Sequence, residues 1–304
     1  MMQKFKKILL TGINGQVGHA LQEKLAHEMC VELFALNREQ LDLSKPDEIR
    51  RVVREIKPDL IINPAAYTAV DQAESEPELA FAINATAPRT LAEEAAKLNA
   101  LLVHYSTDYV YDGTKLSPYV ETDLTHPLSV YGQTKLAGEN AIRDVNPAHL
   151  IFRTSWVYGA YGKNFLKTIL RLASERDALR IVADQFGAPT SSLSIADATV
   201  SILNSWSNSS ADKSGIYHMT NAGRTSWHGF ATEIVMQYSK LVQEKDLPAL
   251  KARIEYITAI TSAEYPTPAA RPTNSSLDTT KLGITFNKQL PPWQLALQDV
   301  LALN

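Results

Sequence analysis

A glycine-rich turn follows the first apolar segment of the chain, and it restricts the possible fold more than any other feature. Residues 7–11 read as a buried strand, and the Gly12-to-Gly18 turn that comes next opens a helical pattern. Gly12 permits a tight turn, Gly15 lets the backbone approach a diphosphate, and Gly18 lets the helix pack closely against the strand. The free N–H groups of the helix N-terminus favour an anion. The turn therefore predicts a dinucleotide-binding βαβ unit.

Short strand-like segments alternate with helical patterns through the first half of the sequence. Helical patterns such as Pro46 to Ile56 and Glu74 to Leu98 separate these segments. Parallel strands need crossover connections, which are usually helices, so the strands should be buried on both faces. The pattern predicts an α/β fold with a Rossmann-like, doubly wound parallel sheet. Its expected strands are Lys7 to Thr11, Val31 to Leu36, Leu60 to Asn63, Leu101 to Ser106 and Leu150 to Thr154.

Beyond about residue 155 the alternation of strand-like and helical segments becomes irregular. Pro189, a Ser/Asn-rich patch and a Pro-rich stretch at 265–272 interrupt it. We expect residues 1–155 to form the dinucleotide-binding Rossmann-like domain. Residues 156–304 should form mainly a smaller, mixed α/β substrate-binding lobe, with some segments returning to the first domain. Such a lobe would lie at the carboxyl edge of the sheet, where ligands of these folds bind.

Charge and cysteine content exclude several classes of protein. The 304 residues carry a formal charge of −3, so no overall positive field favours nucleic acid as a partner. The single cysteine, Cys30, cannot form an intramolecular disulfide, which favours the reducing cytoplasm. The apolar run Ile8-Leu9-Leu10 is too short for a secretory signal, and no run is long enough to span a bilayer. We therefore expect neither export nor a membrane partner.

The end of the second strand predicts which cofactor the turn would bind. An acidic residue there would hold the adenosine ribose of NAD, but this chain has Asn37-Arg38. Asn37 does not repel a 2′-phosphate, and Arg38 offers a planar cation that can pair with one. The expected cofactor is NADPH, with NADH left open.

A Tyr-x-x-x-Lys spacing occurs twice, at Tyr111/Lys115 and Tyr131/Lys135, so the spacing alone does not identify a site. Tyr111 leads into the turn sequence Asp112-Gly113-Thr114, where residues four apart do not meet. The second pair starts a helical pattern, and residues four apart on a helix share a face. We therefore predict that Tyr131 and Lys135 act together.

The chemistry of a phenol and an amine explains this choice. A phenol is a sluggish acid at neutral pH, and a nearby ammonium group lowers its pKa toward the working range. Tyr131 would then protonate a carbonyl oxygen that receives a hydride on its carbon. Thr107, at the end of the fourth predicted strand, can donate a hydrogen bond to that oxygen. The predicted catalytic residues are Tyr131, Lys135 and Thr107.

The G-x-x-G-x-x-G spacing of the turn resembles that of the extended short-chain dehydrogenases/reductases. Further motifs occur along the whole chain: Tyr105 to Val110, Tyr131/Lys135, Phe152 to Gly159, Arg271 to Ser275, Asn63 to Asp71 and Ala73 to Pro77. With these motifs the chain resembles the dTDP-4-dehydrorhamnose reductase family across its whole length. This resemblance implies NADPH-dependent reduction of the 4-keto group of a dTDP-4-keto-6-deoxy sugar to dTDP-L-rhamnose.

The resemblance also implies binding roles for individual positions. Asp42 would contact the adenine, Ala66, Tyr67 and Thr68 would lie along the cofactor, and Arg271 and Asn274 would contact the nucleotide part of the substrate. The full set of expected cofactor contacts is Gly12, Gly15, Gln16, Val17, Gly18, Asn37, Arg38, Asp42, Leu43, Ala65, Ala66, Tyr67, Thr68, Tyr105, Tyr131 and Lys135. The expected contacts with the dTDP-keto-sugar substrate are Thr107, Asp108, Tyr131, Trp156, Arg271 and Asn274.

The chain departs from its relatives at two points. Some relatives join two subunits through a divalent cation held by acidic residues, but the corresponding positions here are His19-Ala20 and Leu193. Hard cations prefer oxygen ligands, so we expect no metal, and a monomer or a weak homodimer without a bridging cation. The other departure is Asn37, where many relatives carry Asp.

Two other functions stay open on these residues. An extended-family epimerase or dehydratase would use the same fold while recycling a tightly held NAD. A non-catalytic subunit, like the regulatory subunit of methionine adenosyltransferase, is also related to these reductases. The presence of Tyr131, Lys135 and Thr107 together argues for catalysis.

Overall fold

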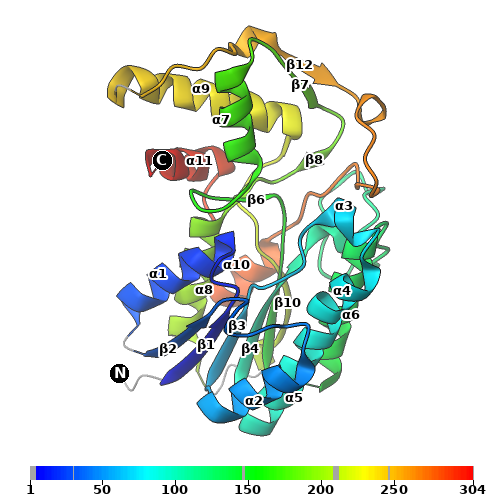
Figure 1. The fold of residues 1–304 in the computed structure, drawn as a ribbon, viewed down its shortest axis with the longest axis vertical. Coiled ribbons are helices and arrows are strands. Elements are labelled where there is room, and N and C mark those ends of the chain that lie inside the picture. Colours follow the sequence, from blue (N-terminus) through cyan, green and yellow to red (C-terminus); the bar gives the residue numbers. More distant parts are fainter. Residues whose placement is uncertain (1–4, 30, 146–147, 208–211, 246, 304) are drawn as a thin grey trace.

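A six-stranded, fully parallel sheet forms the centre of the computed structural model, which describes residues 5–29, 31–145, 148–207, 212–245 and 247–303 (Figure 1). Cys30 lies outside the described residues. The strand order is β10-β5-β4-β3-β1-β2. The strands are β1 (Lys7–Thr11), β2 (Glu32–Leu36), β3 (Leu60–Asn63), β4 (Leu101–Thr107), β5 (His149–Thr154) and β10 (Gly215–His218).

The doubly wound parallel sheet predicted from the sequence is confirmed. One detail of that prediction is wrong: β2 is not fully buried, and its first residue, Glu32, is exposed. The reason is its position, because β2 pairs only with β1 and so forms the edge of the sheet. At the other edge, β10 pairs with β5, so a strand from the second half of the chain completes the sheet.

Helices cover both faces of the sheet, as side-chain alternation along the strands requires. Ile8 and Leu10 of β1 pack in one apolar core with α1 (Gln16–Glu28) and α8 (Ser192–Ser205). Leu9, between them, packs in a second core on the opposite face. That second face is covered by α2 (Pro46–Ile56), α5 (Ala87–Leu98) and α6 (Val130–Val145) (Figure 1).

The helical pattern predicted over residues 74–98 is interrupted in the structure. It divides into α4 (Pro77–Phe81), a π-helical turn η1 (Ala82–Thr86) and α5, after a short α3 (Val70–Ala73). Pro88 lacks the N–H that would bond to the Asn84 carbonyl in a regular helix. That carbonyl instead faces α6, where a Cβ added to Gly138 would lie only 2.1 Å from it.

A third apolar core lies beyond the carboxyl ends of the sheet strands. Its members include Tyr158, Phe230 and Leu297, and this part of the chain also contains three two-stranded sheets. No helix among the described residues is long and apolar enough to cross a membrane. This part contains β6 (Val157–Tyr158), α7 (Phe165–Glu175), β7 (Leu179–Val182), β8 (Phe186–Gly187), β9 (Thr190–Ser191), β11 (Thr225–Ser226), α9 (Trp227–Lys245), β12 (Ile257–Ile260) and α11 (Trp293–Ala302), while α10 (Thr280–Phe286) packs on β10.

Candidate active site

A cavity of about 660 Å³ opens at the carboxyl ends of the central strands. Its floor includes Thr11 at the end of β1, Ser106 in β4 and Thr154 at the end of β5. After β1 the chain passes to one face of the sheet, and after β3 it passes to the opposite face. Doubly wound folds bind their ligands at such a switch point between neighbouring strands.

The residues predicted to contact a cofactor come from distant parts of the sequence, and every one of them lines this cavity. They extend from the glycine turn, past the ends of β2 and β3, to α6. Their binding roles stay predictions, because the structure places them without a ligand. The lining residues predicted in this way are Gly12, Gly15, Gln16, Val17, Gly18, Asn37, Arg38, Asp42, Leu43, Ala65, Ala66, Tyr67, Thr68, Tyr105, Tyr131 and Lys135.

The glycine turn leaves no room for side chains. Gly12 has a φ of +63°, and a Cβ there would lie 2.8 Å from the Cβ of Ala65. A Cβ on Gly18 would lie 2.2 Å from the Gly12 carbonyl oxygen, and the Gly15 N–H donates to that same oxygen at 2.9 Å. The glycine positions therefore pack directly against neighbouring parts of the protein. The N-terminus of α1 faces a space that a diphosphate can occupy.

The residues at the end of β2 form a compact polar corner of the cavity. The Asn37 side-chain oxygen accepts hydrogen bonds from the backbone N–H groups of Glu39 and Gln40, which orders the corner. Arg38 is exposed beside it. Both the side chain and the backbone N–H of Ser44 donate to Asp42, and these bonds lower the pKa of Asp42. The corner thus offers a cation at Arg38 and a fixed carboxylate at Asp42.

Tyr131 and Lys135 both face the cavity from α6. Lys135 is only 1% exposed, and its Nζ donates to the backbone carbonyl of Tyr105 at 2.6 Å. Burial lowers the pKa of Lys135 to about 8. Burial raises the pKa of Tyr131 to about 12, and a hydrogen bond with Thr107 opposes that shift. The arrangement places a proton donor and a titratable amine on one wall, one helical turn apart.

The other Tyr-x-x-x-Lys pair does not line this cavity. The Tyr111 hydroxyl is buried and accepts a hydrogen bond from Arg153 at 2.6 Å. Lys115 instead forms an ion pair with Asp123. Both residues therefore have structural partners away from the cofactor cavity.

Thr107 and Asp108 are buried beside Tyr131 rather than on the cavity wall. The Thr107 hydroxyl donates to Asp108 at 3.0 Å and accepts from the Tyr109 N–H at 3.2 Å. Burial raises the pKa of Asp108 to about 6, although the hydroxyl of Ser155 also donates to it. These contacts hold a threonine hydroxyl and a titratable carboxyl next to the phenol.

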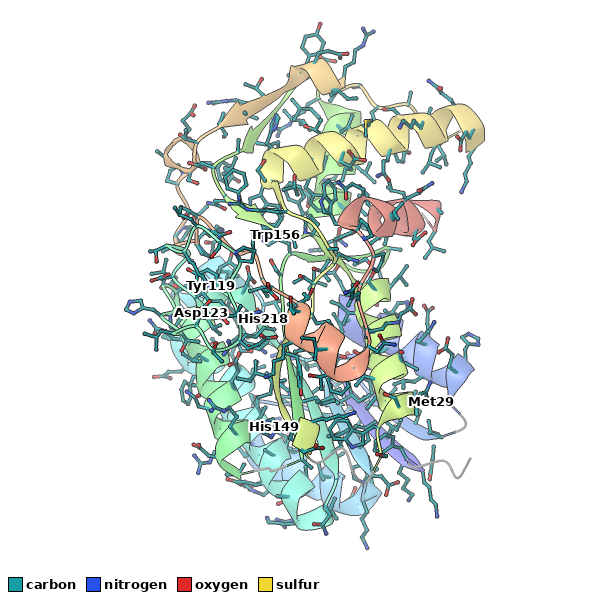
Figure 2. All side chains as sticks on the ribbon, turned by 180° about the vertical axis from the view of Figure 1, so that it is seen from behind. Met29, Tyr119, Asp123, His149, Trp156 and His218 are labelled. Atoms are coloured by element: carbon teal, nitrogen blue, oxygen red, sulfur yellow. The ribbon has the colours of Figure 1, made fainter. Side chains whose placement is uncertain are left out.

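Trp156 lies where the sheet meets the second lobe, beyond the end of β5 (Figure 2). Its backbone is left-handed, with a φ of +48°, which is strained for a bulky residue. Its ring stacks on Trp227 at a centroid distance of 3.5 Å and packs against Gly187. The predicted sugar contact at Trp156 stays a prediction, supported by this strained position at the junction.

Arg271 and Asn274 already have protein partners. Arg271 forms a bidentate ion pair with Asp71, with nitrogen–oxygen distances of 3.0 and 2.8 Å. The Asn274 amide donates to the backbone carbonyls of Lys115 and Ser117. Neither residue lines the cofactor cavity, so a substrate contact at either one would have to share or replace these bonds.

The cavity also contains residues that the sequence analysis did not single out. Thr154 ends β5 just as Thr107 ends β4, so the same strand-end argument could have found it. Its buried Oγ1 has no hydrogen-bond partner among the described residues. Other lining residues flank Asp42 or lie inside the quoted motifs, which gave them no role: Asn14, Leu41, Pro64, Ala69, Glu76 and Val157. The remaining ones lie outside those motifs: Gln72, Leu79, Ile83, Gly162 and Lys163.

Asn84, in the π-helical turn η1, was also missed, and it ties two walls of the cavity together. Its side chain accepts from the Tyr67 N–H at 2.8 Å and donates to the Tyr67 carbonyl at 3.1 Å. The same amide donates to the Thr134 hydroxyl, between Tyr131 and Lys135 on α6. Asn84 therefore fixes the loop after β3 relative to the helix that carries the predicted catalytic pair.

These features fit a nicotinamide dinucleotide. The glycine turn leaves space at a helix N-terminus, Arg38 and Asp42 supply opposite charges at one end, and the orphaned Thr154 hydroxyl lies at the other. Among the described residues, no group of three or more His, Cys, Asp or Glu side chains is placed to hold a metal ion. The predicted lack of a bridging metal between subunits stays a prediction.

Comparison with known proteins decides the family. The sequence profile of the RmlD substrate binding domain matches residues 6–304. The chain belongs to the RmlD substrate binding domain family. A member from Burkholderia thailandensis, a dTDP-4-dehydrorhamnose reductase, is 47% identical over 294 residues, covering 96% of each chain. The dTDP-4-dehydrorhamnose reductase of Escherichia coli K12 is 44% identical over 296 residues, covering 97% of this chain and 96% of that one.

Solved structures of dTDP-4-dehydrorhamnose reductases have the same fold. A dTDP-4-dehydrorhamnose reductase from Clostridium acetobutylicum matches with a TM-score of 0.89 and 36% identity, covering 98% of this chain and 99% of that one. The Bacillus anthracis enzyme, solved in complex with NADP, matches with a TM-score of 0.88, 33% identity and the same coverage. A UDP-glucose 4-epimerase from Thermotoga maritima, at 17% identity and a TM-score of 0.76, shares the fold alone.

Proposed function

We propose that this chain reduces the 4-keto group of dTDP-4-dehydrorhamnose to give dTDP-L-rhamnose, with NADPH as the reductant. One observation carries the proposal: Tyr131 and Lys135 line a dinucleotide-sized cavity in a chain that is 47% identical to a dTDP-4-dehydrorhamnose reductase. NADP is bound in the structure of the Bacillus anthracis relative, which supports the choice of cofactor.

Tyr131 and the side chains around it have different roles in the reduction. NADPH supplies a hydride when it is bound. Tyr131 donates its phenolic proton to the carbonyl oxygen as that oxygen becomes an alkoxide. The ammonium of Lys135 stabilises the phenolate that remains. The hydroxyl of Thr107, which donates to Asp108 in the ligand-free site, would turn that single proton toward the developing charge. The burial of these groups strengthens each interaction, because the local dielectric is low.

The decisive experiment measures NADPH consumption with the dTDP-keto-sugar and identifies the product. Stoichiometric oxidation of NADPH with formation of dTDP-L-rhamnose is expected. An epimerase or dehydratase would instead purify with NAD bound and consume no reductant. A non-catalytic subunit would bind NADPH without turning over.

The corner at Arg38 predicts how the chain discriminates between cofactors. Replacing Arg38 with alanine should weaken NADPH binding about tenfold, because one charge-assisted contact with the 2′-phosphate is lost. Binding of NADH, which lacks that phosphate, should change little. Fluorescence titration of both cofactors measures this. Arg51→Ala, at an exposed site on α2, is the control and should alter neither affinity. An equal loss for both cofactors would contradict the assignment.

The pKa of Lys135 predicts a basic limit to activity. Since burial lowers this pKa to about 8, the ammonium is present at pH 7 and is lost as the pH rises through about 8. The kcat/KM for NADPH should therefore be constant near pH 7 and fall about tenfold per pH unit above about pH 8, because this ratio reports the ionisation of the free enzyme. It is measured between pH 6 and 10. Lys135→Arg keeps its charge throughout, so its profile should lack this fall. A flat wild-type profile to pH 10 would refute the role of Lys135.

The remaining expectations concern the state of the protein in the cell. We infer a monomer or a weak homodimer without a bridging cation, because His19 and Leu193 replace the acidic residues that would bind one. A cytoplasmic location, expected from the lone cysteine, stays a proposal of the same kind.

A further inference from the structure

Three polar side chains lie next to one another across the otherwise apolar central sheet. They are Thr11 at the end of β1, Asn63 at the end of β3 and His104 in β4, and the register pairs Asn63 directly with His104. All three are buried, with 2%, 0% and 0% exposure. They lie two residues beyond Leu9, Ile61 and Leu102, so they face the core beneath α5 and α6. A row of buried polar groups is costly unless each has a partner.

The row is satisfied by hydrogen bonds, and it ends at Lys135. The Thr11 hydroxyl donates to Asn63 Oδ1 at 2.6 Å. The amide nitrogen of Asn63 lies 3.1 Å from His104 Nδ1. On the other side of the ring, His104 Nε2 lies 3.3 Å from Lys135 Nζ. A continuous chain of side chains therefore links the glycine-turn strand to the amine of the predicted catalytic pair.

The partners of His104 determine where its proton lies. Because Asn63 Oδ1 accepts from Thr11, the amide N–H groups of Asn63 face the ring, and one of them donates to Nδ1. A neutral imidazole that accepts at Nδ1 carries its proton on Nε2. Burial, together with the charge of Lys135, holds the pKa of His104 well below its usual value and keeps the ring neutral, although a hydrogen bond with the Asn63 backbone acts in the opposite direction. The Nε2–H group therefore points at Lys135, which can accept that hydrogen bond only as an amine.

The other groups around Lys135 do not cancel the preference for the amine that the His104 hydrogen bond creates. The Tyr105 carbonyl of β4 accepts one N–H from Nζ in either protonation state. Glu139, one turn further along α6, favours the ammonium, but both of its carboxylate oxygens already accept from Arg153 of β5. Tyr131, one turn earlier on α6, is neutral in the resting site. His104 is thus the group whose hydrogen bond distinguishes the two forms of Lys135.

We propose that His104 is a positioning residue that favours the amine form of Lys135, and that Thr11 and Asn63 hold its ring in the required tautomer. Protonation of Lys135 to the ammonium that assists Tyr131 therefore breaks the hydrogen bond from His104. This role rests on the proposed reductase function. The tests below use the protein without NADPH or substrate, so their result does not depend on that function.

The first test measures the protonation of Lys135 directly. Acetylation of the Lys135 peptide by acetic anhydride, followed by mass spectrometry across pH 6 to 11, gives the midpoint at which the amine appears. Asn63→Asp places a carboxylate that accepts from Nδ1–H, which moves the ring proton and leaves the Nε2 lone pair facing Lys135. The midpoint should rise by about one pH unit or more, a tenfold change in equilibrium.

A double-mutant cycle separates this route from a direct charge effect. In a His104→Leu background the ring is gone, so Asn63→Asp should produce little of that rise. An equal rise in both backgrounds, or no rise in either, would overturn the proposal. Thr90→Val is the matched control, because Thr90 is a buried, hydrogen-bonded threonine of α5 whose hydroxyl donates to the Thr86 carbonyl. It should leave the midpoint unchanged.

The second test reads the tautomer in the wild-type protein and uses a variant only to assign the signal. Nitrogen-15 NMR of histidine-labelled wild-type protein at pH 9 reports the tautomer of each ring. The His104 signal is assigned by its absence in His104→Gln. The proposal requires the Nε2–H tautomer at this pH, and finding the Nδ1–H tautomer would refute it.

Discussion

Replacing Tyr131 with phenylalanine should lower reductase turnover by about 10²- to 10⁴-fold, because the reaction loses its proton donor. The phenyl ring can keep the edge-to-face contact with Tyr109, whose ring centroid lies 5.6 Å away. NADPH affinity should therefore fall by less than about tenfold, since only one hydroxyl is lost. Steady-state kinetics with the dTDP-keto-sugar and fluorescence titration with NADPH measure the two effects separately.

The second Tyr-x-x-x-Lys pair supplies the matched control. Tyr111→Phe removes a hydroxyl that contacts Arg153 and His218 and does not line the cofactor cavity. It should lower the free energy of unfolding by about 1–3 kcal/mol and leave most of the turnover. A Tyr131→Phe protein with wild-type turnover, or a Tyr111→Phe protein that is folded but inactive, would contradict the assignment of the catalytic tyrosine.

Among the single substitutions proposed, Arg153→Met should lower the free energy of unfolding most. Arg153 and Glu139 form a buried ion pair, with side chains 3% and 0% exposed, which fastens α6 to β5 next to Lys135. After the substitution, the buried Glu139 carboxylate keeps only the Ser106 hydroxyl as a hydrogen-bond donor among the described residues. Removing one partner of such a pair costs about 3–5 kcal/mol. Thermal melting should show a fall in Tm of roughly 10 °C.

A double variant shows whether the unpaired charge of Glu139 causes this loss of stability. Arg153→Met with Glu139→Leu removes both charges, and replacing a whole buried pair by apolar groups is often close to neutral. Much of the lost stability should therefore return. The exposed pair Arg51 and Glu55 is the control, and Arg51→Met should change the free energy of unfolding by less than about 1 kcal/mol. A double variant no more stable than Arg153→Met would contradict this account.

Local sequence patterns were sufficient for the elements that carry the chemistry. The glycine turn, the strand ends and the Tyr131/Lys135 pair each depend on residues close together in the chain. Backbone geometry alone then decides which of them share a face. This is why the cofactor contacts predicted from the glycine turn, the end of β2 and the Tyr131/Lys135 pair reached one cavity. The contacts at Asp42 and at Ala66, Tyr67 and Thr68 came from the family resemblance.

Contacts between distant segments did not follow from the sequence. Arg271 has a cation suited to a diphosphate, but the fold places it against Asp71, 200 residues away. Asn84 has no distinguishing pattern, yet the π-helical turn directs its amide to Tyr67 and Thr134. The edge position of β2 likewise depends on strand order, which short-range alternation does not encode.

The sequence by itself determined the parallel α/β architecture, the nucleotide-binding turn and the tyrosine–lysine pair, because each is set by neighbouring residues and by repeating backbone geometry. Only the tertiary structure decided which polar groups are buried together. It placed His104 between Asn63 and Lys135, and it paired Arg153 with Glu139. Burial and the distance between groups from different strands set the protonation of Lys135, and these quantities exist only after the chain has folded.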